Sequence, residues 1–334
     1  MSIEVQQADA DALASWDQWL AQSEAGTFFH QIDVLDVLNK HAETTLHHLV
    51  GFKGNQPVGA LPVFELSKGP FTFVLSPPPK LGVPALGPVL FDADQLKRHT
   101  LEKRNRRFID GCVDWINSNI SPNYTRIVSE PAYHDPRPFA WNGFDMTPYH
   151  TYHVDLTAGE SVVMDRFKKS LRSDIRRSQD EDYTVRRGDK HDARWIINKV
   201  EERYEAQGEA FTITPSYIDD LLHAVGLDQL PVYVGELNGE RISGILSPRF
   251  DSTMYYWQGG GRPDVSFPMN DLIHWQLIQD GIDEGYAVYD LVGANTRRLC
   301  EYKSKFGPSL RTYYELEAGS TATTLLTKLY KRLQ

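Results

Sequence analysis

The fold is decided by two stretches of the sequence, HHLVGFKGNQPVGALPVFEL at residues 47–66 and PVYVGELNGERISGILSPRF at residues 231–250. Both have the pattern of a strand, a tight polar turn and a second strand, and Asn238 and Gly239 form a dipeptide typical of hairpin turns. A shift of about 184 residues superimposes Val50 on Val234 and keeps the apolar positions in step. The sequence therefore predicts that one hairpin occurs twice in the chain.

The similarity continues outward from the two hairpins. A strand ending in helix-breaking residues follows each of them, FTFVLSPPP at 71–79 and TMYYWQGGG at 253–261. An amphipathic helix comes next in both halves, and then a further strand, YTRIVSEPA at 124–132 and YAVYDLVGA at 286–294. This shared order indicates two copies of one α/β unit.

Each copy is predicted to hold a mixed antiparallel and parallel sheet flanked by helices, because antiparallel strands come first and crossover helices are inserted only later. Thr151-Tyr152 and Thr312-Tyr313 are expected to open the last strand of each copy. The predicted domains are residues 1–150 and 151–334, with a single intertwined domain as the alternative. Such a sheet is expected to splay where a strand ends in glycines and a helix begins, which leaves backbone groups for an anion.

Composition and charge exclude several classes of protein. The chain has 334 residues, 41% of them hydrophobic, which argues against disorder and small disulfide scaffolds. A net charge of −10 argues against a DNA-binding protein, so any anion site must be local. Cys112 and Cys300 lack metal-ligand spacing, and we expect neither a disulfide nor a metal. No signal peptide or membrane span is apparent, which predicts a cytoplasmic protein.

Four motifs resemble those of one known family. They are GTFFHQ at 26–31, FKKSLRSDIRRSQDEDYTVRRG at 167–188, PMNDLIHWQLIQDGIDEGYAVYDLVGA at 268–294 and EYKSKFG at 301–307. Together they resemble the Fem-type branch of the GNAT N-acyltransferase superfamily, which includes peptidoglycan interpeptide-bridge aminoacyltransferases and acyl-CoA-using relatives. The resemblance implies two tandem GNAT-like domains, the second of them catalytic. It also implies transfer of an acyl or aminoacyl group to an amine of a small molecule or peptide, with acyl-CoA or aminoacyl-tRNA as donor.

The sequence departs from the family pattern in two places. The long coiled-coil insertion of some members is missing. A pyrophosphate-binding loop begins at Gln258, but Pro263 stands where its final small residue belongs. This departure favours aminoacyl-tRNA as the donor, whereas the acidic net charge favours acyl-CoA.

Two residues, Lys303 and Asp290, are the candidate catalytic groups. Tyr302 and Lys303 match the family's aromatic-lysine pair, which implies that Tyr302 stacks on the donor and that Lys303 stabilises the oxyanion of acyl transfer. A solvated lysine beside a core tyrosine is the alternative. Asp290 ends a strand where open α/β sheets place ligands, and it is a candidate to orient or deprotonate the amine. The alternative is a structural carboxylate bonded to the turn amides of Val292 and Gly293.

Four further residues are candidates for binding the donor or its phosphates. Arg172 and Arg176 are four apart on one helix face and form a two-pronged grip for phosphate, with a solvated basic face as the alternative. Asn270 is predicted to cap the helix that follows the glycines. Trp257 lies in an aromatic strand, where it either stacks on the donor or belongs to the core.

Other functions remain open on the sequence alone. The duplicated scaffold is also compatible with a non-catalytic module that binds a nucleotide or RNA, including tRNA. A basic run at residues 97–107 is interpreted as a solvated helix surface, with non-specific RNA contact as the alternative. A third hypothesis is an accessory protein that makes peripheral contact with anionic membrane.

Overall fold

The computed structural model describes residues 2–262 and 264–319, which form two compact units. Unit 1 contains residues 2–149 and 312–319, and unit 2 contains residues 150–311. Pro263 and the last part of the expected second domain, residues 320–334, lie outside the described residues. Within the described ranges, no helix has both the length and the apolar composition that crossing a bilayer would require.

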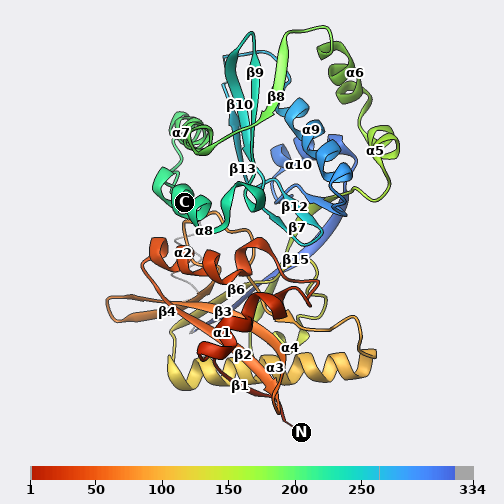
Figure 1. Ribbon diagram of the computed structural model, residues 1–334. Helices are drawn as coiled ribbons and strands as arrows, with labels where there is room; N and C mark the ends of the chain where they lie inside the picture. The colour runs from red at the N-terminus through yellow and green to blue at the C-terminus, as the bar shows by residue number, and fades with distance from the viewer. Residues whose placement is uncertain (1, 263, 320–334) are drawn as a thin grey trace. The chain divides into compact units, whose positions relative to one another are not determined.

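Unit 1 is a mixed sheet with helices on both faces (Figure 1). Its elements, in chain order, are β1 (Glu4–Gln7), α1 (Ala10–Leu20), α2 (Ile32–Ala42), β2 (Thr45–Lys53), β3 (Gln56–Lys68), β4 (Phe71–Ser76), β5 (Val89–Leu90), α3 (Arg98–Asn119), β6 (Tyr124–Val128), α4 (Arg137–Trp141) and the end of β15 (Ser309–Gly319). The strand order is β1-β2-β3-β4-β6-β15, with β5 paired to β3. β4 and β6 run parallel, and the other strand pairs of this sheet are antiparallel among the described residues.

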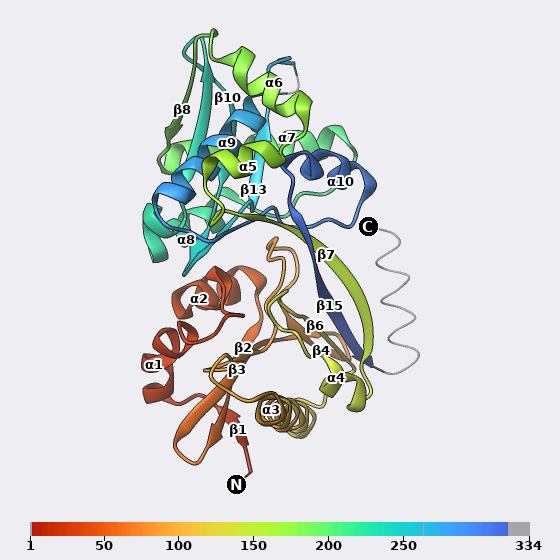
Figure 2. The same ribbon diagram turned by 90° about the vertical axis from the view of Figure 1, so that its right-hand side faces the viewer.

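The core of unit 1 lies between α3 and the sheet. Phe108, Ile109 and Cys112 of α3 are fully buried against Leu49 of β2 and Leu61 of β3. The first two follow one another and the third is one turn further, which is the spacing that puts apolar side chains on one helix face. Helices α1 and α2 cover the opposite face of the sheet (Figure 2).

Unit 2 contains two sheets. Its elements are β7 (Asp145–Asp155), which enters from unit 1, α5 (Glu160–Arg166), α6 (Lys169–Ser178), β8 (Tyr183–Arg187), α7 (Lys190–Ala206), α8 (Pro215–Gln229), β9 (Val232–Leu237), β10 (Glu240–Leu246), β11 (Arg249–Phe250), β12 (Thr253–Tyr255), β13 (Gln258–Gly261), α9 (Met269–Asp283), β14 (Val288–Asp290), α10 (Arg297–Lys303) and the single turn η2 (Ser304–Phe306). One sheet has the order β7-β14-β12-β11 and the other β13-β10-β9-β8. Helices α7 and α9 flank the second sheet on opposite sides (Figure 1).

The predicted repeat is confirmed down to the register of the hairpins. Val50 pairs with Ala60 in the first hairpin, and the equivalent Val234 pairs with Gly244 in the second. The next strand is parallel to its neighbour in both units, β4 to β6 and β12 to β14. The predicted fold class, mixed α/β with two copies of one sheet-and-helix unit, is therefore the observed one.

The last strand of each copy differs from the prediction. β7 follows the first copy in sequence but pairs with β14, and β15 follows the second copy but pairs with β6. The strand at 312–319 falls within the expected second domain of residues 151–334, but in the structure it belongs to unit 1. An ion pair accompanies this pairing, since Arg126 of β6 lies 2.5 Å from Glu315 of β15. Thr151 and Thr312 lie inside these strands rather than at their starts.

Candidate active site

The two sheets of unit 2 separate at Tyr256. The backbone N–H of Tyr256 donates to the carbonyl of Asp290 at 2.8 Å, whereas that of Trp257 donates to Leu246 at 3.3 Å. The chain therefore pairs with β14 up to this point and with β10 beyond it, as β12 gives way to β13. We call the divergence of β13 and β14 the splay. The sequence predicted such an opening from the strand that ends in glycines.

Lys303 lies at the splay with its side chain buried, only 4% of the residue being exposed. Its ammonium group donates to the carbonyl of Val292 and, at 3.0 Å, to that of Gly293. Both residues have left-handed backbone, with φ of 48° and 83°, a conformation that costs energy for a β-branched side chain such as Val292. Nζ also lies 5.4 Å from the centroid of the Tyr256 ring. The lysine is therefore part of the turn and not solvated on the surface.

Burial lowers the pKa of Lys303 to about 8, because the charged form loses its hydration, and the carboxylate of Asp290 opposes this shift. Asp290 itself is held by the turn. Its Oδ1 accepts hydrogen bonds from Thr151 Oγ1 at 2.5 Å and from the Val292 amide at 2.7 Å. The Gly293 amide donates instead to Thr151 Oγ1 at 3.1 Å. The structure thus brings Asp290 and Lys303 to the same loop, and gives Asp290 one of the two turn-amide bonds of the structural alternative.

Tyr302 contacts Asp271 and a second lysine, Lys305. Its hydroxyl donates to Asp271 Oδ1 at 3.0 Å, and the same carboxylate binds Lys305 Nζ at 2.6 and 2.7 Å. Lys305 Nζ lies 3.9 Å from the centroid of the Tyr302 ring, in cation–π geometry. Burial raises the pKa of Tyr302 well above its usual value, so the hydroxyl remains a donor. One face of the predicted stacking ring is therefore covered by Lys305.

The predicted phosphate grip lies on α6. Arg172 donates to the carbonyl of Asp165 at 2.9 Å, so its guanidinium is bonded to α5. Arg176 is exposed in the last turn of the helix. The buried face of α6 is formed by Leu171 and Ile175.

Asn270 does not have the capping role predicted for it, and Trp257 has the surroundings of the core alternative. The N-cap prediction for Asn270 is wrong, because α9 begins at Met269 with Pro268 in the capping position. Asn270 lies in the first turn and accepts a hydrogen bond from Ser243 Oγ. Trp257 is 6% exposed and packs edge-on against Tyr217 at 6.1 Å, as a core residue does. The ring beside Lys303 is that of Tyr256, the residue before Trp257.

The sequence interpretation missed His274, a buried residue of α9. Its Nδ1 lies 2.8 Å from the hydroxyl of Tyr289, and its ring centroid lies 4.5 Å from that of Tyr256. Burial lowers its pKa well below the usual value, and the charges of Lys305 and Lys303 add to this effect. His274 follows Asp271 by three residues, which places both on one face of the helix. This spacing was the signal available in the sequence.

Unit 1 closes the place that corresponds to the splay with its own chain. After β4, the segment at 77–88 turns back so that the amide of Leu86 donates to the Val128 carbonyl of β6 at 3.1 Å. His30 Nε2 lies 3.0 Å from the carbonyl oxygen of Gly87. A Cβ atom on Gly87 would lie 2.6 Å from the Cα of Ser129, so two backbones are in direct contact here. The corresponding place in unit 1 is therefore occupied by the protein's own backbone.

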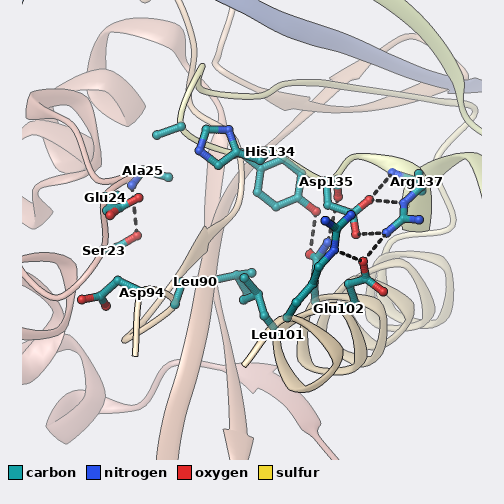
Figure 3. Close-up of a pocket in the computed structure, with 15 residues that line it drawn as sticks. Ser23, Glu24, Ala25, Leu90, Asp94, Leu101, Glu102, His134, Asp135 and Arg137 are labelled. Carbon is teal, nitrogen blue, oxygen red and sulfur yellow. Dashed lines mark hydrogen bonds and ion pairs between the residues drawn. The ribbon is translucent and has the colours of Figure 1, made fainter. Parts of the chain in front are cut away.

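Unit 1 has a pocket of about 560 Å³ elsewhere, which borders α3 (Figure 3). Its cations are paired with its own carboxylates. Arg137 lies 2.6 Å from Asp135 and 3.1 Å from Glu102, which also binds Arg98 at 3.1 Å. None of the predicted site residues lines this pocket. In the part of the chain that the structure describes, no cluster of three or more His, Cys, Asp or Glu is arranged to hold a metal ion.

Residues 165–304 match a family of acetyltransferase (GNAT) domains. This segment contains the splay, Asp290, Tyr302 and Lys303. No curated protein sequence matches the chain.

Several solved structures have the same fold. The crystal structure of FemX is similar with a TM-score of 0.70 at 12% identity, over 93% of this chain and 96% of that one. The C-terminal domain of a putative lysylphosphatidylglycerol synthetase from Agrobacterium fabrum is similar with a TM-score of 0.57 at 14% identity, covering 96% and 95%. A tandem GNAT protein from the clavulanic acid biosynthesis pathway has a TM-score of 0.55 at 12% identity, covering 95% and 98%. The chain thus has the tandem fold of these structures, and its residues 165–304 match the GNAT acetyltransferase domain family.

Proposed function

We propose that the protein is an N-acyltransferase whose reaction takes place at the splay of unit 2. One observation carries the proposal: a buried lysine, Lys303, is fixed at the divergence of two strands within the segment that matches GNAT acetyltransferase domains. Acyl transfer develops negative charge on a carbonyl oxygen, and a preorganised cation away from bulk water stabilises such charge. Two of the three N–H bonds of the ammonium hold the turn carbonyls, which leaves one for the substrate.

The reaction joins an amine to an activated acyl group. The amine nitrogen attacks the carbonyl carbon, a C–N bond forms, and the π electrons of the carbonyl move onto its oxygen. When this tetrahedral intermediate collapses, the bond to the donor breaks and its electron pair leaves with the thiolate or alkoxide. The proton that the nitrogen loses balances the leaving group, directly or through solvent. Lys303 acts on the oxygen, and Asp290 keeps the Lys303 turn in place.

The donor is an activated ester or thioester, aminoacyl-tRNA or acyl-CoA, and the acceptor is an amine of a small molecule or peptide. The similarity to the tandem GNAT protein of the clavulanic acid biosynthesis pathway, whose structure is described as being without AcCoA, supports acyl-CoA within this range. Arg172 and Arg176 on α6 are the proposed contacts for the phosphates of the donor. No metal is required for this chemistry.

Label transfer tests the proposal directly. Purified protein is incubated with labelled acetyl-CoA, and separately with charged tRNA, in the presence of a panel of amines and peptides. Lys303→Ala and the length-matched Lys303→Met should each reduce turnover about 10²-fold, the usual loss when one oxyanion donor is removed. Lys190→Ala, an exposed lysine of the same unit, is the matched control and should retain full activity.

Two results would contradict the proposal. Turnover that is unchanged in both Lys303 variants would remove this residue from the reaction. Donor binding without turnover on any amine, equally strong in Lys303→Ala, would identify a nucleotide- or RNA-binding module instead.

A further inference from the structure

We propose that His274 is a second, uncharged hydrogen-bond donor of this site, and that its Nε2–H binds the acyl carbonyl oxygen of the donor together with Lys303. The inference rests on the proposed function and deepens it. It assigns the oxyanion two donors of different kinds, one a cation and the other a neutral imidazole.

His274 and Lys303 share one aromatic neighbour. The centroid of the His274 ring lies 4.5 Å from that of Tyr256, and Lys303 Nζ lies 5.4 Å from the same centroid. Tyr256 is the residue at which β12 and β14 cease to pair, so both groups border the start of the splay. The ring of Phe306, at 4.8 Å, packs against the imidazole as well.

The hydrogen bond to Tyr289 fixes the tautomer of His274. Burial raises the pKa of Tyr289 far above its usual value, so the phenol keeps its proton. The fully buried Tyr289 hydroxyl lies 2.8 Å from His274 Nδ1 and donates to it, because a buried phenol proton left without an acceptor is costly. Nδ1 is then the acceptor, and the single proton of the neutral ring resides on Nε2.

Nε2 of His274 has no hydrogen-bond partner among the described residues, although the residue is only 1% exposed. The neighbouring rings of Tyr256 and Phe306 offer no lone pair to its N–H. Native proteins pair nearly all their buried donors, and an exception next to a reaction site points to a group that a ligand satisfies. The contacts of His274 thus place its proton on Nε2 and leave this N–H without an acceptor among the described residues.

Burial, together with the charges of two neighbouring lysines, keeps the imidazole neutral. Burial and the charges of Lys305 and Lys303 all lower the pKa of His274, so the ring does not acquire a second proton near neutral pH. A neutral imidazole donates a hydrogen bond to a carbonyl oxygen without adding a third positive charge to the site. It stabilises the oxygen as the electron pair of the C=O bond moves onto it, and it transfers no proton.

The first test is spectroscopic and needs no substrate. In the ¹⁵N-imidazole-labelled full chain, NMR should show His274 as the neutral Nε2–H tautomer, without titration between about pH 5 and 8. Tyr289→Phe removes the phenol proton and should shift the resonances toward a mixture of tautomers. A neutral ring with its proton on Nδ1, or a ring that titrates in this range, would overturn the inference.

The second test separates catalysis from packing. His274→Phe keeps an aromatic ring in the cluster but removes the donor, and should lower kcat about 10²-fold while KM changes less than about threefold. His274→Gln places an amide N–H near the position of Nε2 and should recover part of that loss. His223→Phe, an exposed histidine on α8, serves as the control. If His274→Phe folds and retains the wild-type kcat, the residue only packs, and the inference fails.

These results are distinct from those that test the proposed function. Unchanged turnover in the Lys303 variants contradicts the acyltransfer proposal, whatever the tautomer of His274. The wrong tautomer, or full activity in His274→Phe with a Lys303-dependent reaction, contradicts only the role of His274. If His274→Phe does not fold, the tautomer and the His274→Gln rates decide.

Discussion

One ammonium group performs two tasks in this site. Lys303 holds the carbonyls of Val292 and Gly293, both of which adopt left-handed backbone, and it carries the positive charge at the splay. A turn of this kind has high conformational energy and persists only because its surroundings enforce it. The charge and the shape of the site therefore depend on the same side chain.

The lowered pKa of Lys303 predicts how activity depends on pH. The ammonium is charged below about pH 8 and loses its proton as the pH rises through that value. If the cation stabilises the oxyanion, kcat/KM should fall above about pH 8 rather than follow the increasing fraction of free amine. Lys303→Arg keeps a charge at every accessible pH and should lack this alkaline decline, even if its rate is lower. A wild-type profile that rises steadily to pH 10 would contradict the role of the cation.

The two arginines of α6 predict an effect on donor binding. Removing Arg172 and Arg176 together should raise the Kd of the donor about tenfold or more, as expected for losing charge-assisted bonds to phosphate, and should weaken its dependence on salt. Isothermal titration over a range of salt concentrations measures both quantities. Arg177→Ala changes a residue of the same helix that is paired with Asp174, and should leave binding unaltered. Equal affinity in the double variant would assign these arginines to the solvated surface.

The residues of the site were not equally accessible to prediction. Tyr302, Lys303 and Asp290 lie in short motifs, and a family resemblance picks out such motifs. His274 depends on Tyr256, Tyr289 and Phe306, which come from three other parts of the chain. Only the folded structure brings these side chains together and leaves Nε2 without a partner. The hydrogen-bonding state of His274 therefore cannot be predicted from the residues next to it in the sequence.

At the scale of single elements, prediction succeeded where local chemistry decides. The two hairpins follow from turn residues, and Asn238 and Gly239 do adopt positive φ, at 52° and 78°. The predicted N-cap of α9 was wrong because two nearby residues offer competing start signals. Both Asn270 and Pro268 favour a helix beginning, and α9 begins at Met269, one residue before Asn270, with Pro268 and its fixed φ in the capping position.

The close contact between Gly307, which follows η2, and Arg166 of α5 leads to a prediction about stability. It has φ of 64°, and a Cβ atom there would lie 2.4 Å from the carbonyl oxygen of Arg166. Gly285 is a matched control, since it has φ of 84° with open space around it. Gly285→Ala should cost about 1 to 2 kcal/mol of the free energy of unfolding for the left-handed backbone alone. Gly307→Ala should cost a further 1 to 3 kcal/mol, about the usual cost of overpacking.

Urea unfolding of both glycine variants measures this difference. Lys305 lies two residues before Gly307, and its carbonyl accepts a bond from the Lys168 amide at 2.8 Å. A displacement of η2 should therefore also lower activity in Gly307→Ala but not in Gly285→Ala. Equal losses of stability in the two variants would contradict the proposed close contact.

At the scale of the whole molecule, the two copies share a plan but differ in detail. The repeat was visible because hairpins, parallel strands and crossover helices recur in one order. The exchange of the last strands was not visible, because TYHVD in β7 and TYYEL in β15 both begin with Thr-Tyr and neither segment names its partner strand. Partner residues on other strands, such as Arg126 for Glu315, are known only from the folded structure.

This exchange predicts how fragments of the protein behave. A fragment of residues 1–149 lacks β15, so β6 loses its antiparallel neighbour and becomes an exposed edge. It should unfold at a lower urea concentration than a fragment in which a short flexible linker joins residue 149 to residues 312–319. Circular dichroism during urea titration compares the two. Equal midpoints would mean that β15 adds nothing to unit 1.

The position of β15 has a consequence for the order of events during synthesis. The ribosome delivers the whole of unit 2 before it delivers the strand at 312–319 that completes the sheet of unit 1. The copy that is translated first is therefore finished last, and its β6 must wait with one side unpaired while residues 150–311 emerge and fold.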